Sequence, residues 1–181
     1  ALGDGGMVVT GDEALAERLR ALRQYGWRQR YVSDIVGINS RLDEIQAAIL
    51  RVRLTMLEAE NQRRRDIAAA YDGGLAGLPI ALPARRAKCT HVFHQYVLRC
   101  GKRDALQRAL AARGIGTNIH YPVPVHLQPA YRGRLAIGPA GLGETERAAT
   151  EVLSLPMFPQ LGEDQVGRVI ASVHGAFAEI D

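Results

Sequence analysis

The chain has 181 residues, of which 47% are hydrophobic and 23% charged, so it is expected to fold as one domain or two small ones without a disulfide framework. No segment approaches the roughly 18 unbroken apolar residues of a membrane span, so we expect no membrane contact and a cytoplasmic protein. The net charge of +4 leaves nucleic-acid binding possible. However, the arginines are spread over expected helix faces without a recognition motif, and we expect no nucleic-acid partner.

The chain holds two cysteines, Cys89 and Cys100, which are too far apart for a CxxC motif. We expect both to be free thiols of a reducing compartment. No cysteine–histidine spacing resembles a zinc site, and His91 and His94 would point to opposite faces of a strand. We therefore expect no metal.

The N-terminal segment combines a glycine turn at residues 3–6 with a strand expected at residues 5–10. A phosphate-binding P-loop would follow a strand and open a helix, whereas this turn precedes a strand, so the turn is interpreted as structural. An amphipathic helix is expected next, beginning at Gly11 or Asp12 and ending at Gly26.

The segment 27–40, "WRQRYVSDIVGINS", is expected to be irregular, and it is either a surface excursion or part of a site. The longest helix signal follows, from about Ser40 to about Tyr71, with Ser40 as its cap and Asp43 completing a capping box. Two apolar stripes run along this helix, and one of them could be covered by a partner subunit.

The second half of the chain predicts a small α/β lobe with the order β-α-β-loop-α-α. Strands are expected at 91–100 and 116–121. Helices are expected at 102–115, at 143–155, where Pro156 would end the helix, and at 163–180.

Asn39, Ser40 and Arg41 stand at the start of the long predicted helix, where free N–H groups and the helix dipole favour an anion. An amide and a guanidinium at this place suit a phosphate. Alternatively, Asn39 and Ser40 only cap the helix, and Arg41 pairs with Asp43 or Glu44.

A second group of polar rings lies in "GTNIHYPVPVHLQPAY", where prolines stiffen the loop that carries His120, Tyr121, His126 and Tyr131. One interpretation is a pocket wall in which His120 and Tyr121 form hydrogen bonds with a ligand. The other is a well-packed loop between lobes.

Five segments resemble, in order and spacing, the pyridoxal-phosphate-dependent sugar aminotransferases of the DegT/DnrJ/EryC1/StrS family. They are "GDGGMVVT", "LAERLRALRQYG", "GINSRLDEIQAAIL", "RGIGTNIHYPVPVHLQPAY" and "EVLSLPMFPQL". The resemblance implies an α/β chain that is the C-terminal part of a type I aminotransferase fold. Residues 1–72 would be the end of the large domain with a long connecting helix, and residues 73–181 a small α/β domain.

The resemblance also implies site residues. The lysine that binds pyridoxal phosphate would lie just before Ala1, and neither Lys88 nor Lys102 matches its position. Asn39 would reach the cofactor phosphate of the partner in a homodimer, with Arg41 supporting it. The residues implied to lie near the nucleotide-linked sugar are Tyr31, His120 and Tyr121.

The implied reaction is ping-pong transamination, in which an amino acid, usually glutamate, supplies an amino group that passes to a nucleotide-linked keto-sugar. The isolated chain is expected to be inactive. The alternative is a relative that lacks the lysine and acts as a dehydratase or a regulator.

Overall fold

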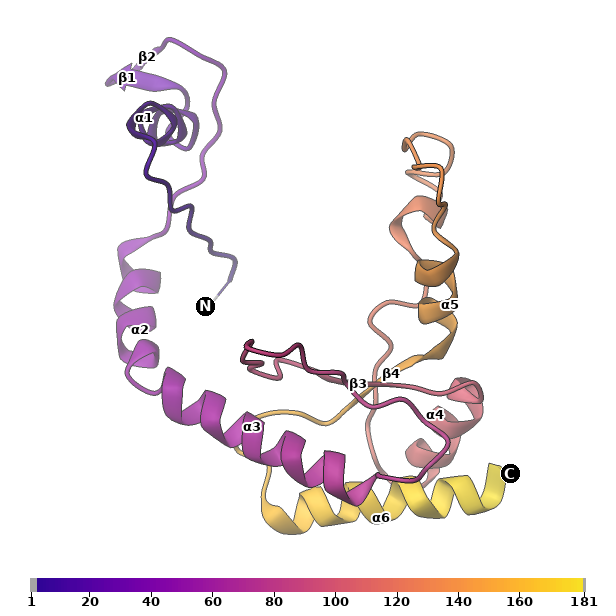
Figure 1. The fold of residues 1–181 in the computed structure, drawn as a ribbon. Coiled ribbons are helices and arrows are strands. Elements are labelled where there is room, and N and C mark those ends of the chain that lie inside the picture. The colour runs from indigo at the N-terminus through magenta and orange to yellow at the C-terminus, as the bar shows by residue number, and fades with distance from the viewer. Residues whose placement is uncertain (1–2, 181) are drawn as a thin grey trace. The chain divides into compact units, whose positions relative to one another are not determined.

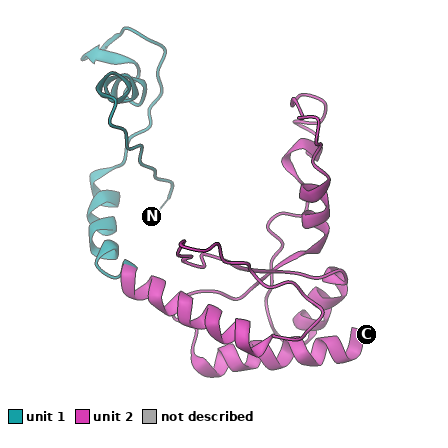
Figure 2. Cartoon of the chain, in the orientation of Figure 1, with its two compact units in different colours: residues 1–57 teal, residues 58–181 magenta. Residues whose placement is uncertain are grey.

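A computed structural model describes residues 3–180, and the chain divides into two compact units, Ala1–Leu57 and Glu58–Asp181 (Figure 2). The sequence places a domain boundary after residue 72 instead. The difference arises in the helix before that boundary, whose residues Ile67, Ala68 and Tyr71 are buried in the core of the second unit. The functional division at residue 72 stays a prediction.

The first unit contains helix α1 (Glu13–Leu22), the strands β1 (Trp27–Gln29) and β2 (Val32–Ser33), and helix α2 (Glu44–Leu54) (Figure 1). Asp12 caps α1, and its Oδ1 accepts a hydrogen bond from the Leu15 N–H at 3.0 Å, as the sequence predicts. β1 and β2 pair as an antiparallel hairpin inside the segment expected to be irregular.

The strand expected at residues 5–10 is absent: the segment has no regular structure, and Met7, Val8 and Val9 are 86%, 70% and 85% exposed. A strand exists only beside another strand that accepts its backbone hydrogen bonds. No strand among residues 3–180 pairs with this segment.

The long helix expected at residues 40–71 is two helices, α2 and α3 (Leu57–Gly74). At the break, the Thr55 hydroxyl donates to the Val52 carbonyl at 2.8 Å, and the Thr55 and Met56 N–H groups bond only three residues back. A threonine hydroxyl that takes a helix carbonyl competes with the regular ladder. The cap also differs, since Asp43 rather than Ser40 begins α2 and its N–H donates to Gln46 Oε1 at 3.2 Å.

The second unit is built on the antiparallel strands β3 (Tyr96–Arg99) and β4 (Val152–Leu155), with Tyr96 opposite Leu155. Single bridges extend this pair on both sides, Ala81 to Arg99 and Asn118 to Ser154. The first predicted strand is thus shorter than expected, and the second is a single bridge.

Strand β4 corrects the helix expected at 143–155, because α5 (Gly143–Glu151) ends before it. Val152 is already extended, and Leu153, Ser154 and Leu155 are buried in the sheet. Burial on both faces favours a strand for this short apolar run, which periodicity could not distinguish from the last turn of a helix.

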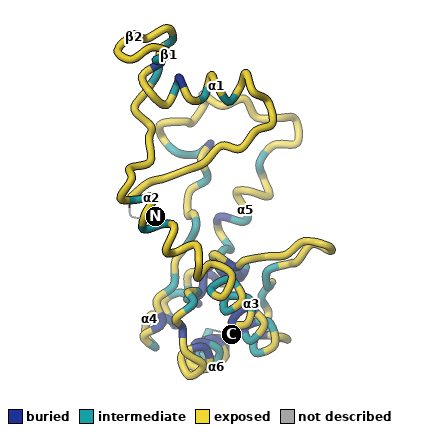
Figure 3. The backbone as a smooth tube through the Cα atoms, turned by 90° about the vertical axis from the view of Figure 1, so that its left-hand side faces the viewer, coloured by how far each residue is buried: buried dark blue, intermediate teal, exposed yellow. Residues whose placement is uncertain are grey.

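The core of the second unit forms where the sheet meets α3, α4 (Arg103–Ala112) and α6 (Glu163–Ile180), as the buried residues in Figure 3 show. α4 and α6 pack together, and α3 approaches α6 so closely that a Cβ at Gly74 would lie 2.7 Å from Ile170 Cδ1. Gly114, with φ of +73°, follows the end of α4, two residues after Ala112. A short 3₁₀ helix, η1 (Val125–Leu127), lies in the loop before α5.

Two buried tyrosines add polar ties to this core. Tyr71 donates to the Pro156 carbonyl at 2.9 Å, and Tyr96 donates to Asp72 Oδ1 at 2.7 Å. Burial raises the pKa of both hydroxyls above the ordinary value, and for Tyr96 the bond to Asp72 raises the pKa further. Arg85 pairs with the same carboxylate.

Among the helices of residues 3–180, none has the length and apolar character needed to cross a membrane.

Candidate functional site

The hairpin segment of the first unit is closed by two glycines that touch. Gly26 has φ of +78°, and a Cβ there would lie 1.7 Å from the Ile35 carbonyl oxygen. A Cβ on Gly37 would lie 2.1 Å from the Gly26 nitrogen. Only glycine permits this backbone approach, which returns the chain from the hairpin to the end of α1.

Asn39 is positioned by that return. The Ile38 N–H donates to the Leu22 carbonyl at 2.8 Å, the Ser40 N–H donates to the Arg23 carbonyl at 2.9 Å, and Asn39 itself bridges Gln24. The sequence expected Asn39 at a helix N-terminus, but α2 begins only at Glu44. The placement of Asn39 therefore comes from the C-terminal end of α1, and the dipole of α2 does not supply its anion-binding character.

Asn39 and Arg41 form a pair. The Arg41 Nε donates to Asn39 Oδ1 at 3.1 Å, which also assigns the amide, because only the oxygen can accept. The expected alternative, an ion pair of Arg41 with Asp43 or Glu44, does not form.

The bond leaves the amide N–H₂ of Asn39 and both Nη groups of Arg41 without a hydrogen bond to any of residues 3–180. Both side chains are exposed. These N–H donors lie on neighbouring side chains and carry one positive charge between them, which fits a phosphate group.

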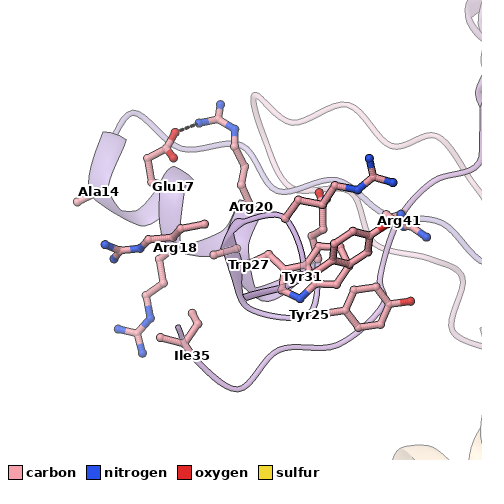
Figure 4. A pocket seen from close by; sticks show the side chains of 13 residues that line it. Ala14, Glu17, Arg18, Arg20, Tyr25, Trp27, Tyr31, Ile35 and Arg41 are labelled. Carbon is pink, nitrogen blue, oxygen red and sulfur yellow. Dashed lines mark hydrogen bonds and ion pairs between the residues drawn. The ribbon is translucent and has the colours of Figure 1, made fainter. Parts of the chain in front are cut away.

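An aromatic trio stands beside this pair. The Trp27 ring lies 5.0 Å from that of Tyr25 and 5.3 Å from that of Tyr31. The Arg30 guanidinium lies 4.8 Å from the Tyr31 ring, and that of Arg41 lies 6.0 Å from the Tyr25 ring (Figure 4). Tyr25 and Tyr31 both have positive φ, 58° and 70°, a conformation that is uncommon for such bulky residues.

These side chains line a hollow of about 1260 Å³ within the first unit (Figure 4). Its charged lining is mostly basic, with one acid, Glu17, against five arginines: Arg18, Arg20, Arg28, Arg30 and Arg41. Tyr31 and Arg41, which the sequence analysis expects at a site, both line this hollow. Asn39 does not line it but is hydrogen-bonded to Arg41. Tyr25 also lines the hollow, although the sequence indicates only the end of a helix at this position.

In the second unit, His120 is held by a residue that the sequence did not indicate. His120 Nδ1 lies 2.8 Å from the Ser154 Oγ, and Ser154 is 6% exposed on β4. A polar residue inside the apolar run "VLSLP" is the signal that could have identified Ser154.

His120 and Ser154 line a second hollow of about 190 Å³, together with His94, Gln95 and Asn118. Tyr121 does not line it; its side chain is 73% exposed, and its ring meets that of His120 edge-on at 5.5 Å. The two predicted residues are therefore adjacent, but only His120 faces this hollow.

His126 has a structural role, as the second interpretation of its loop allowed. It is buried, and its Nε2 lies 2.9 Å from Glu146 Oε1, which ties η1 to α5. His91 lies outside any strand, where its Nδ1 accepts the Phe93 N–H at 2.9 Å. In the part of the chain that the structure describes, no group of three histidine, cysteine or acidic side chains could hold a metal ion.

The candidate residues thus fall into two groups. Tyr31, Asn39 and Arg41 belong to the first unit, and His120 and Tyr121 to the second. The cysteines lie apart from both groups, with Cys89 exposed and Cys100 buried.

Comparison with known proteins gives relatives of about twice this length. The dTDP-3-amino-3,4,6-trideoxy-alpha-D-glucose transaminase of Streptomyces venezuelae is 52% identical over 180 residues, which are 99% of this chain and 47% of the relative. The erythromycin biosynthesis sensory transduction protein EryC1 of Saccharopolyspora erythraea is 49% identical over 174 residues, which cover 96% of this chain and 47% of EryC1. The chain spans about half the length of these curated relatives.

A solved structure agrees with this alignment. The crystal structure of S. venezuelae DesV in complex with a ketimine intermediate matches with a TM-score of 0.89 at 50% identity, over 96% of this chain and 47% of DesV. The mixed α/β fold therefore corresponds to about half of an aminotransferase structure. The family model of the DegT/DnrJ/EryC1/StrS aminotransferases matches residues 1–174, and the chain belongs to that family.

Proposed function

We propose that this chain is part of a pyridoxal-phosphate-dependent aminotransferase that moves an amino group from an amino acid, with glutamate as the proposed donor, to a nucleotide-linked keto-sugar. Family membership and a 52% identical sugar-nucleotide transaminase support the reaction class. The chain would supply the end of the large domain and the small α/β domain.

The observation that carries the proposal is the Asn39–Arg41 pair. Its donors bear one positive charge and form no ion pair with an acid of residues 3–180, which suits the phosphate of the cofactor. When bound, pyridoxal phosphate supplies the electron sink for amino-group transfer. The role proposed for Asn39 and Arg41 is to hold the phosphate so that the reactive end stays in register with the substrate.

The sugar nucleotide is proposed to meet Tyr31, His120 and Tyr121. Tyr31 lies among arginines and aromatic rings, which suit a phosphorylated aromatic ligand, and His120 lies in a polar hollow. The lysine that carries the cofactor is proposed to precede Ala1. Of the two lysines here, Lys88 is exposed in a linker and Lys102 donates to the Ile180 carbonyl at 2.8 Å, and neither lines a hollow.

We propose a homodimer in which Asn39 acts on the cofactor bound by the partner. The exposed apolar side chains of α2 support an interface there, since Ile45, Val52 and Leu54 are 76%, 64% and 66% exposed. Such a surface on a helix is normally covered in the assembled protein.

The test uses the full-length enzyme and three variants. Asn39→Ala removes one hydrogen bond to a charged group, worth ~1.5–3 kcal/mol, and should weaken pyridoxal phosphate binding roughly 10- to 100-fold. Asn39→Asp keeps an acceptor for Arg41 Nε but replaces the donor by a negative charge, and should weaken binding more. Ser40→Ala, at the next exposed position, is the control and should bind normally.

The Asp variant separates two roles. If Asn39 only orients Arg41, Asn39→Asp would retain the cofactor, and the phosphate role would be wrong. Cofactor affinity is measured by absorbance titration of the apoenzyme. The isolated 181-residue chain is expected to form no borohydride-reducible adduct with pyridoxal phosphate, and a stoichiometric adduct would contradict the upstream lysine.

A second candidate is a relative without transaminase activity, a dehydratase or a regulator. The name of EryC1, a sensory transduction protein, favours keeping this candidate. Turnover of a nucleotide keto-sugar with glutamate by the full-length protein would exclude it. A residue other than lysine at the upstream position would support it.

A further inference from the structure

Ser154 is a buried polar residue in the middle of the sheet of the second unit. It is 6% exposed, and its neighbours on β4, Leu153 and Leu155, are 0% and 3% exposed. Its side chain forms one hydrogen bond, to His120 Nδ1 at 2.8 Å. A buried hydroxyl is costly unless it is bonded, so this contact fixes both partners.

The backbone around the pair is held from both sides. The Ser154 N–H donates to the Asn118 carbonyl at 2.8 Å, and the Asn118 N–H donates to the Ser154 carbonyl at 3.2 Å. On its other edge, β4 pairs with β3, where Ser154 stands opposite Val97. Ser154 is thus anchored between two backbone segments, one of which reaches His120 two residues later.

The contact selects one tautomer of the His120 ring. The Ser154 hydroxyl proton has one acceptor among residues 3–180, and that acceptor is His120 Nδ1. If Nδ1 carried the proton instead, the buried hydroxyl would lose the acceptor for its own proton. Among the described residues, this contact therefore favours the neutral tautomer that carries its proton on Nε2.

The Nε2–H of His120 makes no hydrogen bond within the described part of the chain. His120 lines the hollow of about 190 Å³ with His94, Gln95 and Asn118, and no acidic residue lines that hollow. An uncharged N–H donor among amides suits the oxygen of a carbonyl, hydroxyl or phosphate group.

We propose that Ser154 is a positioning residue: it holds His120 in one orientation and tautomer, so that Nε2–H donates to an oxygen of the nucleotide-sugar substrate. This inference rests on the proposed function for the identity of the ligand. It assigns a role to a residue that does not itself touch the substrate. The role proposed for the hydroxyl is to keep the donor aimed before the substrate arrives.

The kinetic test uses the full-length holoenzyme with Ser154→Ala, Ser154→Thr and the control Thr150→Ala. Thr150 is exposed, and its hydroxyl bonds only within α5, to the Arg147 carbonyl at 2.8 Å. Ser154→Ala should raise KM for the nucleotide keto-sugar about 3- to 10-fold, the range of one neutral hydrogen bond. KM for the amino donor should stay within about 2-fold of wild type. Thr150→Ala should leave both values unchanged.

Ser154→Thr keeps the hydroxyl, so this variant should keep KM for the nucleotide keto-sugar close to that of wild type. In the double variant Ser154→Ala/His120→Gln, the serine change should add nothing to the loss caused by His120→Gln. If Ser154→Ala impaired both half-reactions equally, or if its effect added to that of His120→Gln in the double variant, Ser154 would only support the fold. Either result would overturn the proposal.

A spectroscopic readout separates this inference from the proposed function. The ¹⁵N signals of labelled histidine, with His120 assigned through His120→Gln, should show the proton on Nε2 in wild type and mixed tautomers in Ser154→Ala. This pattern would support the positioning role even if no nucleotide keto-sugar were turned over. The same tautomer in wild type and Ser154→Ala would overturn it, whatever the activity.

Discussion

The contact between Gly37 and Gly26 is expected to decide whether Asn39 reaches its place. Gly37→Ala puts a Cβ 2.1 Å from the Gly26 nitrogen, 2.6 Å from the Tyr25 carbonyl carbon and 2.8 Å from the Leu22 carbonyl oxygen. All three atoms belong to the backbone, so no side-chain rotation can relieve the clash. The segment that carries Asn39 must move away from the end of α1.

The free energy lost in Gly37→Ala can be worked out from the backbone hydrogen bonds on the two sides of this contact. They join Tyr25 N–H to the Ile38 carbonyl at 3.0 Å, Ile38 N–H to the Leu22 carbonyl at 2.8 Å, and Ser40 N–H to the Arg23 carbonyl at 2.9 Å. At ~0.5–1.5 kcal/mol each, their loss amounts to roughly 2–4 kcal/mol. Local opening of the hairpin should therefore become roughly 30- to 1000-fold more frequent.

The assay is limited trypsin digestion of the full-length protein, because Arg28 and Arg30 are exposed in the hairpin and become cleavable when it opens. Cofactor affinity, measured in parallel, should fall as in Asn39→Ala. The matched control is Gly11→Ala, whose Cβ would meet nothing within 4 Å. If Gly37→Ala is digested no faster than Gly11→Ala and keeps its cofactor, the contact does not position Asn39.

Three further predictions concern the core and the interface. The pKa values of Tyr71 and Tyr96 are raised in the folded protein, whereas in the unfolded chain both hydroxyls titrate near pH 10. Above about pH 10 only the unfolded chain therefore loses these protons. The free energy of unfolding should then fall by ~1.4 kcal/mol per pH unit for each tyrosine. Above about pH 10, the urea midpoint of unfolding should fall less steeply with pH in Tyr96→Phe than in wild type. Leu153→Ala, at a fully buried position, should destabilise the second unit by ~2–5 kcal/mol in urea unfolding. Val52→Glu, on the exposed face of α2, should shift the proposed dimer toward monomer in analytical ultracentrifugation, and an unchanged dimer would place the interface elsewhere.

The helices were the most predictable part of the fold, because their signals are local. Asp12 caps α1 as expected, since capping depends on residues a few positions apart. The break between α2 and α3 was missed because apolar spacing continues through Thr55, whose hydroxyl takes the carbonyl of Val52.

The strands were less predictable, because each depends on a partner that is distant in sequence. Val152–Leu155 looks like the end of a helix until Tyr96–Arg99 is placed beside it, with Arg99 opposite Val152, 53 positions away, and Tyr96 opposite Leu155, 59 positions away. Met7–Thr10 shows the reverse, a strand-like run with no strand to pair with among residues 3–180. The residue types of a segment set its propensity for a β-strand, and pairing with a distant segment decides whether the strand forms.

The candidate site shows the same division between residue identity and residue placement. Asn39 and Arg41 were selected as donors at a helix N-terminus, yet their arrangement comes from a glycine contact and a hydrogen bond to each other. Ser154 is not among the residues that the sequence indicates, because its proposed role depends on contact with the ring of His120, 34 residues away. The sequence identifies groups able to bind a ligand, and it can mark Ser154 as a polar residue in an apolar run, but only the folded structure shows which group Ser154 contacts.

The arginines of this chain differ in whether they form ion pairs with acidic residues. Some arginines elsewhere pair with acids, as Arg63 does with Glu163 and Arg99 with Glu151, whereas Arg108 and Arg134 form no ion pair with any of residues 3–180. At the larger hollow, Arg18, Arg30 and Arg41 form no ion pair with any of residues 3–180, and Arg30 and Arg41 lie against tyrosine rings instead. Positive charge left uncompensated beside aromatic faces favours a compact anionic ligand with a ring over an extended nucleic-acid backbone, which would require a continuous basic surface. The proposed sugar nucleotide is a ligand of this kind, so the hollow gives part of the chain's basic charge a proposed role, while the expectation of no nucleic-acid partner stays a prediction.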